Sequence, residues 1–597
     1  MTLRFGKRGL TIFILIIAIN FSTPTNTHAF SLGKPWYEWC AAFCFLPFYV
    51  LGESISDSFE KNDALILIVD TETETLTEID GFPRAIWSSA VIVENKVAIG
   101  RSIKDISLLI LDADSGKITK KGVSKANWGE DSMAVVGNKV VIGRDGSILI
   151  VDTEKKTVAE KGGLPKANWG YESTAVVENK VVMGFYSQNK SISSILIIDT
   201  AKGTVSEKGG LSKTQYSHSW GCGSTAAVGS KVVMGGYGSI LIVDTKTGIV
   251  SEKGGLSKGR WGLGSTAVVG NKVVMGCTQW SQWGSGNSIL IIDTVKETVS
   301  EKGRLSGSLG FWVSTCTAVV GNKVVMEHVN IHNEDDTAIL IVDTEKETVT
   351  EKRGFSKGSW DFAAVVGNKV VMGSGAEGAS ILIVDITKET VTEKRRVFSK
   401  AKWDKDSMVA VIGNKVIIRP RRGNSIFIID AVKETVTEKR GIYEPRAYED
   451  KMITVGNKIV IGGYGAILII DTAKGTVTEK RGISKAQWGY NNTAVVGNKV
   501  VMGSKGNSIL IVDTTKGTII EKGGLPEAHW GFNSTTVVEN KVIMGCSGER
   551  DNGSSILIID TEKGTVTEKG GLSEARWGYN STVVVGNKVI MEGHKKD

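Results

Sequence analysis

The sequence predicts an all-β protein of the β-propeller class, in which four-stranded blades surround an axis. A strand-like phrase such as 148–153 (ILIVDT) recurs along most of the chain, and its Asp returns every 40 to 50 residues. Runs of β-branched residues separated by Gly and Asn surround each copy. A period of this length in a strand-rich sequence is typical of propeller blades. The recurring Asp residues are Asp70, Asp112, Asp152, Asp199, Asp244, Asp293, Asp343, Asp385, Asp430, Asp471, Asp513 and Asp560.

One repeat, taken around Asp244, divides into four strands that we name A to D in chain order. Residues 224–228 (STAAV) form strand A, and 231–235 (KVVMG) form strand B. Residues 239–244 (SILIVD) form strand C, and 249–253 (IVSEK) form strand D. Gly-Ser, Gly-Asn or Glu-Asn between A and B predicts a tight turn, because Gly and Asn tolerate the positive φ that a tight hairpin demands. A second tight turn of four residues is expected between C and D.

The apolar content predicts the radial order of the strands. Strands B and C are continuous apolar runs, as expected of strands covered on both faces. Strand A starts with small residues and suits the crowded axis. Strand D alternates apolar residues with Thr, Glu and Lys, which is typical of a solvent-exposed edge strand. We therefore expect A to be innermost and D outermost.

Twelve repeats predict twelve four-stranded blades, most simply as two six-bladed propellers in tandem, because known rings usually have four to eight blades. Marks of duplication recur six units apart: the sixth and twelfth units end strand B in Met-Glu, at Glu327 and Glu592. The first and seventh units share a shortened spacing of eight residues, from Trp87 and from Trp360 to the Asn of the A–B turn.

The predicted rings are residues 62–330 and 331–597. Each half begins with strands C and D and ends with A and B, so its own ends would complete one blade. Residues 64–79 would then pair with 317–326, and residues 338–352 with 582–591. A single twelve-bladed ring is the alternative, because the outermost ends of the chain also match.

The repeat resembles the kelch family of propellers, in which a strand ending in Gly-Gly precedes a strand ending in Asp. That Gly-Gly stands at Gly235-Gly236 and at Gly462-Gly463, and the resemblance extends over residues 62–592. It implies a propeller fold. Kelch-type enzymes place a cluster of His, Tyr, Arg or Glu at the axis, and we identify no such cluster in this sequence.

The N-terminus predicts export. Residues 1–29 combine a basic start, a twelve-residue apolar stretch and a small-residue cleavage site, which together are typical of a signal peptide. Residues 30–61 form an aromatic, apolar segment. Its core, 36–51, is either packed against a propeller or held at a membrane interface, which aromatic side chains favour. The mature protein is expected to be secreted, periplasmic or extracellular, with peripheral membrane contact as an option.

Antiparallel connectivity places the A–B and C–D turns at one end of every blade, the turn face, and the B–C and D–A connections at the other, the loop face. The turns are short and uniform, so this face is expected to be functionally quiet, and charge reversal at Lys231 or Lys272 is expected to change any ligand affinity by no more than about 0.5 kcal/mol. The loop face carries the variation and is the expected binding surface. The candidate binding residues are Gln279, Trp280, Gln282, Trp283 and Tyr186.

A Trp recurs in nearly every D–A connection, for example Trp261. It predicts a wedge between adjacent blades whose N–H bonds a loop carbonyl. The alternative is a series of exposed rings that stack on sugars. Trp280 and Trp283 lie outside the repeat pattern, so packing does not require them.

Signals for other chemistry are weak. The net charge of +8 is spread over the D strands, and the basic loop at residues 419–422 is expected to be a solvated surface with no nucleic-acid partner. Residues 255–259 and 354–358 match the nucleophile-elbow string by chance. His328, His332 and residues 334–336 are more consistent with a polar linker than with a metal site. Cys222, Cys277, Cys316 and Cys546 are expected to be small buried residues. We predict no metal, no cofactor and no catalytic residues.

These observations favour a non-enzymatic binding or scaffold protein whose loop face engages a protein or a glycan. The alternative is a secreted or periplasmic kelch-type enzyme acting on sugars. A pocket with convergent titratable groups would distinguish the enzyme from the binding protein.

Overall fold

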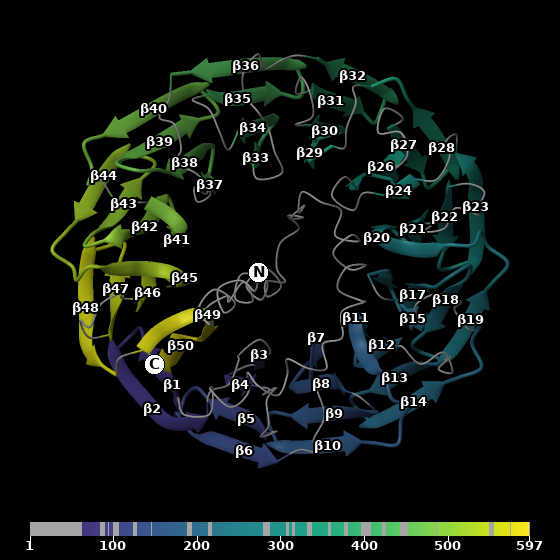
Figure 1. The fold of residues 1–597 in the computed structure, drawn as a ribbon, viewed down its shortest axis with the longest axis horizontal. Helices are drawn as coiled ribbons and strands as arrows, with labels where there is room; N and C mark the ends of the chain where they lie inside the picture. The colour runs from purple at the N-terminus through teal and green to yellow at the C-terminus, as the bar shows by residue number, and fades with distance from the viewer. Residues whose placement is uncertain are drawn as a thin grey trace, which may run out of the picture.

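The computed structural model describes residues 63–83, 90–93, 95–99, 107–122, 128–144, 146–187, 194–212, 218–221, 223–278, 287–305, 310–312, 317–330, 337–355, 360–374, 380–395, 407–420, 425–441, 452–484, 486, 488–547, 554–573 and 575–595. These residues form antiparallel sheets with the order A-B-C-D, set around a ring (Figure 1). The predicted all-β propeller class is therefore confirmed. Within these ranges, no helix is long and apolar enough to cross a bilayer.

Strand A of each sheet lies on the inner side of the ring and strand D on the outer side, as predicted (Figure 1). The A strands are β3 (Ala90–Val93), β7 (Trp128–Val136), β11 (Asn168–Val177), β16 (Thr225–Val228), β20 (Arg260–Val269), β25 (Ala318–Val320), β29 (Phe362–Val366), β33 (Met408–Ile412), β37 (Met452–Val455), β41 (Trp488–Val496), β45 (Ala528–Val538) and β49 (Ala575–Val585). Two short strands, β15 (His218–Trp220) and β24 (Gly310–Trp312), pair with B strands.

The B and C strands form the buried middle of each sheet. The B strands are β4 (Lys96–Ile99), β8 (Lys139–Arg144), β12 (Lys180–Ser187), β17 (Lys231–Gly235), β21 (Lys272–Thr278), β26 (Lys323–Asn330), β30 (Lys369–Ser374), β34 (Lys415–Arg419), β38 (Lys458–Gly462), β42 (Lys499–Gly506), β46 (Lys541–Ser547) and β50 (Lys588–Lys595). The C strands are β1 (Asp63–Asp70), β5 (Ser107–Asp112), β9 (Ser147–Asp152), β13 (Ile195–Asp199), β18 (Ile240–Asp244), β22 (Asn287–Asp293), β27 (Ala338–Asp343), β31 (Ser380–Asp385), β35 (Ser425–Asp430), β39 (Ala466–Asp471), β43 (Ile509–Asp513) and β47 (Ser554–Asp560).

The D strands form the outer edge, and their residues are largely exposed or half-buried, as in β10 and β14. They are β2 (Thr75–Pro83), β6 (Ile118–Gly122), β10 (Thr157–Lys161), β14 (Thr204–Lys208), β19 (Ile249–Lys253), β23 (Thr298–Leu305), β28 (Thr348–Lys352), β32 (Thr390–Lys394), β36 (Thr435–Arg440), β40 (Thr476–Arg481), β44 (Thr518–Lys522) and β48 (Thr565–Leu572).

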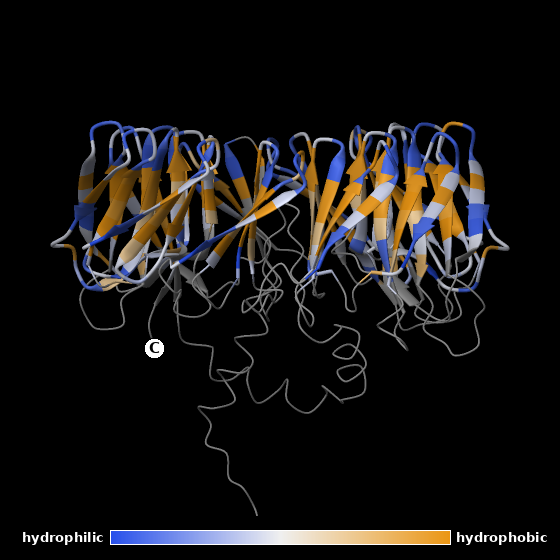
Figure 2. Ribbon diagram, turned by 90° about the horizontal axis from the view of Figure 1, so that it is seen from above, coloured by the Kyte–Doolittle hydropathy of each residue, from blue (hydrophilic) through white to orange (hydrophobic). Residues whose placement is uncertain are grey.

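The hydrophobic core is divided into clusters that lie between neighbouring blades. One such cluster joins Val501 and Ile509 of one blade to Trp530, Met544 and Leu557 of the next. The apolar residues occupy the middle of the strands, and polar residues lie toward the turns (Figure 2). Because each core cluster needs both neighbours, a blade at an open end would leave one apolar face uncovered.

The A–B turns use the backbone conformation predicted for them, at their first residue. Gly229 has φ +56°, and the same position is Glu178 or Glu539 in other blades, each with φ near +54°. In the C–D turns, the last residue has the positive φ, as in Gly248 (+72°) or Glu347 (+54°). A side chain at such a φ costs on the order of 1 kcal/mol, so the Glu residues need a compensating contact.

The predicted closure into two tandem rings is wrong. Strand β1 pairs with β50 at the other end of the chain, from Ala64↔His594 to Asp70↔Lys588. Strand β27 pairs with β26, which precedes it directly. Residues 62–330 and 331–597 therefore do not close on themselves. At the middle of the chain, strand B (β26) pairs with the strand C that follows it (β27), as in the other blades. The two chain ends complete the remaining blade, through β1 and β50.

This closure has a consequence for a truncated chain. An Asp336→stop variant would keep β1 and β26 but lose β50 and β27, which pair with them. We expect it to self-associate or aggregate, because both ends would expose a sheet edge and an apolar blade face. Light scattering after gel filtration, with a thermal melt, checks this. A monomeric fragment with a cooperative transition would instead support two independent rings.

Candidate functional site

The candidate binding residues on the loop face lie mostly outside the described residues. Gln279, Trp280, Gln282 and Trp283 connect β21 to β22 within residues 279–286, so their role stays a prediction. The backbone of Tyr186 lies at the loop end of β12, opposite Asn168 and, on its other side, Ser219. His332 and residues 334–336 also lie outside the described residues.

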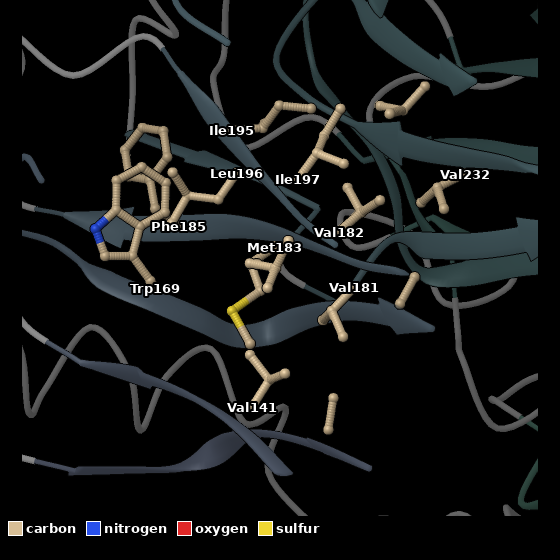
Figure 3. Close-up of a cluster of buried hydrophobic side chains, with 14 of the residues drawn as sticks. Val141, Trp169, Val181, Val182, Met183, Phe185, Ile195, Leu196, Ile197 and Val232 are labelled. Atoms are coloured by element: carbon tan, nitrogen blue, oxygen red, sulfur yellow. The ribbon is translucent and has the colours of Figure 1, made fainter. Parts of the chain in front are cut away.

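The recurring Trp is a packing residue wherever its side chain is described. In three blades its N–H donates to the carbonyl four residues earlier, at 3.0 Å from Trp169 to Pro165, at 3.2 Å from Trp488 to Ser484 and at 3.1 Å from Trp530 to Pro526. Figure 3 shows Trp169 beside Phe185, with ring centroids 5.6 Å apart. The predicted packing role is confirmed for the residues that are at most 1% exposed: Trp169, Trp220, Trp261, Trp360, Trp488, Trp530 and Trp577. The predicted bond to a loop carbonyl is confirmed for Trp169, Trp488 and Trp530.

The Gly at the end of strand B is required by the Trp of the following blade. A Cβ at Gly235 would lie 2.0 Å from the carbonyl oxygen of Trp261, and one at Gly184 would lie 1.9 Å from that of Trp220. No real side chain tolerates such a distance from backbone. The recurring Gly therefore lets the inner strand of one blade approach strand B of the blade before it, and we call this contact the glycine–tryptophan joint.

A Gly235→Ala variant tests the joint. We expect a loss of at least about 3 kcal/mol in the free energy of unfolding, because the added methyl would force two blades apart. Gly254→Ala is the matched control, since a Cβ there meets nothing within 4 Å. Denaturant titrations of both variants measure the difference. Equal stabilities would show that the joint tolerates a side chain.

Glu327 replaces this Gly in one blade and changes the joint. Its side chain is 1% exposed, and its Oε1 accepts the backbone N–H of Trp360 at 3.0 Å. The next strand, β29, then pairs without the irregularity that follows Trp169 and Trp261 in their strands. The Glu at the end of strand B and the short spacing from Trp360 to the A–B turn therefore occur together, at the same contact between two blades. Glu592 has the same place in its strand and is also 1% exposed.

The repeated Asp and Thr at the end of strand C hold the turns of the turn face in place. Oδ1 of Asp244 accepts the N–H groups of Lys246 and Thr247 at 2.9 and 3.0 Å, which closes the C–D turn. The Thr245 hydroxyl donates to the Ser230 carbonyl at 2.7 Å, which ties this turn to the A–B turn. The N–H of Thr247 is the main cause that holds the pKa of Asp244 below its usual value. The repeated phrase is therefore a structural device.

The Lys that starts strand B bridges to the following blade. Nζ of Lys272 donates to the Thr344 carbonyl at 2.6 Å and to Oε1 of Glu347 at 3.0 Å, and its side chain is only 13% exposed. Lys541 makes the same contacts across the chain ends, to Thr71 at 2.6 Å and Glu74 at 2.9 Å. Equivalent bonds to the next blade are made by Lys139, Lys180, Lys231, Lys323, Lys369, Lys415, Lys458, Lys499 and Lys588.

This bridge shows that Lys231 and Lys272 are structural residues, whereas their effect on ligand affinity stays a prediction. It also supplies the contact that the strained turn residues need. Glu347 and Glu297 have positive φ, and each receives a Lys from the preceding blade. The hydrogen bond from Lys272 is the main cause that lowers the pKa of Glu347. Glu347 is charged at neutral pH, and its contribution to stability is lost as the pH falls through that lowered pKa.

Charge reversal separates the bridging Lys from ordinary turn residues. We expect Lys231→Glu to cost about 2–3 kcal/mol, because it places a carboxylate in a mostly buried position against Glu297. Lys202→Glu, at an exposed turn position, is expected to change stability by no more than about 0.5 kcal/mol. Thermal and chemical denaturation of both variants, at low and high salt, provide the check. A Lys231→Glu variant as stable as the Lys202→Glu variant would show that the Lys231 bridge does not stabilise the ring.

The segment after strand D is fixed to the next blade by a Glu of that blade's own strand D. Oε2 of Glu301 accepts the N–H of Ser257 at 3.3 Å, and Oε2 of Glu252 accepts that of Ser212 at 2.9 Å. Ser257 belongs to the string that matches the nucleophile elbow. Its hydroxyl lies 3.3 Å from that of Ser288, so these contacts of Ser257 are structural.

Several unusual polar residues are buried at the loop ends of the B strands. His328 is 1% exposed, and burial, aided by the Arg353 charge, lowers its pKa to about 4. It is therefore neutral at physiological pH. Arg419 is also 1% exposed, which contradicts the prediction of a solvated surface at that residue. No group of three His, Cys, Asp or Glu with metal-binding geometry occurs among the described residues.

Two of the cysteines are small buried residues, as predicted. Cys277 and Cys546 are free thiols in adjacent positions to Trp261 and Trp530 across the A–B pairing. Burial is the main cause that raises the pKa of the Cys277 thiol. A thiol in this state is a poor nucleophile.

No family model and no curated protein matches the chain. Among solved structures, the computationally designed Ika8 protein is similar at 16% identity over 59% of this chain and 95% of its own, with a TM-score of 0.29. AztD from Citrobacter koseri is similar at 11% identity over 71% and 96%, with a TM-score of 0.28. BamB from Moraxella catarrhalis follows at 12% identity over 62% and 92%, with a TM-score of 0.25. These likenesses carry no argument about function.

Proposed function

We propose that this chain is an exported, non-enzymatic binding or scaffold protein, built on one twelve-bladed ring, whose loop face engages a protein or a glycan. One observation carries the proposal: the recurring Trp, Lys, Glu and Asp described above are occupied in contacts within and between blades. The repeat therefore builds the ring. Recognition is left to the residues that differ between blades.

The differences between blades gather in the B–C and D–A connections, which share the loop face. The longest departures from the repeat include Gln279–Trp283 and the segment that follows Tyr186. Rigid strands that carry diversified connections at one end are a common way to build a binding surface. Trp and Tyr supply large contact areas and are enriched among residues that dominate binding energy.

A double variant, Trp280→Ala with Trp283→Ala, tests this function. We expect it to leave the melting temperature nearly unchanged and to weaken ligand capture by at least about 1–2 kcal/mol, since blade packing does not require these residues. Binding is measured on a glycan array and against candidate protein partners. Trp261→Ala is the matched control: its buried side chain fills the space between blades, so we expect about 3–5 kcal/mol of destabilisation.

Two outcomes would contradict the proposal. A double variant that unfolds like Trp261→Ala would assign Trp280 and Trp283 to packing. Turnover of a sugar by the intact protein would favour the kelch-type enzyme instead.

A further inference from the structure

A row of half-exposed valines lines the inner side of the ring. The row occupies equivalent positions of seven A strands, and the residue before each valine is buried, as Ala175 (8% exposed) is before Val176. Ala227 and Thr454 hold this position in two other blades. The A strands border the centre of the ring (Figure 1), so these half-exposed valines lie on its innermost strands. Its members are 38–42% exposed: Val135, Val176, Val268, Val319, Val365, Val411 and Val495.

Several hydroxyl groups beside this inner valine row are already hydrogen-bonded within their own blade. Two residues before Val176 and Val268, a Thr hydroxyl donates to the carbonyl of the Gly four residues earlier, at 2.8 Å from Thr174 to Gly170 and from Thr266 to Gly262. The pair before Val495 does the same at 3.4 Å. In other blades this position is apolar: Met133, Ala363 and Val409. The inner wall therefore offers an incoming group mainly apolar surface. A contiguous apolar surface on an exported protein usually marks a place that another segment or molecule covers.

We propose that residues 36–51 of the same chain cover part of the inner valine row. This segment holds seven aromatic residues, has Glu38 as its one charged side chain, and has no counterpart in the repeat. Its apolar, aromatic composition matches the apolar side chains of the inner valine row. The inference is independent of any ligand on the loop face.

The segment also joins the ring at a place from which it can reach the wall. The chain enters β1 at the loop face, and β1 is separated from the inner strand β49 only by β50. Val584 of β49 lies opposite Val589, which lies opposite Val69, so it is six residues along β1 from Asp63. Two strand spacings and six residues along the strand amount to about 22 Å, whereas the 11 residues between Leu51 and Asp63 span up to about 36 Å when extended. Val584 of β49 belongs to the row and is less exposed than the seven valines in other blades. The arc around β49 is therefore the expected docking position.

Disulfide trapping tests this position, because the segment carries its own thiols. In the mature chain from residue 30, Cys44→Ser leaves Cys40 as the segment's single thiol. Cys is then placed on the wall in three separate variants: Val584→Cys in the blade where the chain enters, and Val135→Cys and Val495→Cys two blades away on either side. A disulfide needs the two Cα atoms within about 7 Å, so trapping reports close approach.

Two controls separate docking from chance collision. Val319→Cys has the same exposure on the far side of the ring, and Val432→Cys is 67% exposed on the turn face. We expect at least one of the three near-wall variants to cross-link to Cys40 at least about fivefold more than Val432→Cys, because docking raises the effective concentration of the thiol. The bonds are identified by peptide mapping. Near-wall yields no higher than those of Val432→Cys would overturn the proposal.

A membrane surface is the competing occupant for the same aromatic residues. Flotation of the mature chain with vesicles of phosphatidylcholine and phosphatidylglycerol distinguishes the two. Docking is supported if Trp36→Ser with Trp39→Ser abolishes the near-wall cross-link and leaves the melting transition cooperative. Flotation that depends on these two residues, without a near-wall cross-link, overturns docking in favour of membrane attachment.

Discussion

The close approach between the Gly that ends strand B and the Trp carbonyl of the next blade sets the spacing of the whole ring. At Gly235 and Gly184, this approach leaves no room for a methyl group. The Trp side chain then fills the space between the two sheets. The Lys bridge at the turn face and the Glu–Ser bond after strand D act on the same pair of blades, so neighbouring blades are connected at three separate places.

The conserved phrase of the repeat is explained by these connections. Asp closes the C–D turn, Thr ties the C–D turn to the A–B turn of the same blade, and Lys binds the C–D turn of the following blade. The last residue of the C–D turn shows how two physical effects offset each other. Gly248 adopts a positive φ without a penalty, whereas Glu347 adopts it at a cost and gains the ion pair with Lys272. Either residue is therefore compatible with the same turn.

Strand order, turn conformation and the packing role of the Trp could be predicted from the sequence, because each depends on a local pattern of apolar, small and turn-forming residues. Closure could not. A six-bladed ring turns by about 60° at each joint and a twelve-bladed ring by about 30°, and this angle depends on the glycine–tryptophan joint. The six-unit phase reflects the altered joint at Glu327 and its counterpart Glu592. The burial of Lys231 and Arg419 could not be predicted from the sequence, because it depends on contacts with a neighbouring blade or at the end of a strand.

The pairing of β1 with β50 determines how the ring would respond to a pulling force. Ala64 lies opposite His594, so the beginning of β1 and the end of β50 lie at the same end of this antiparallel strand pair. Tension applied to the two termini would act along the interstrand hydrogen bonds and break them one after another. Strands loaded from opposite ends must instead break their bonds together. The closing blade is thus mechanically the weakest point of the ring, and opening would start there.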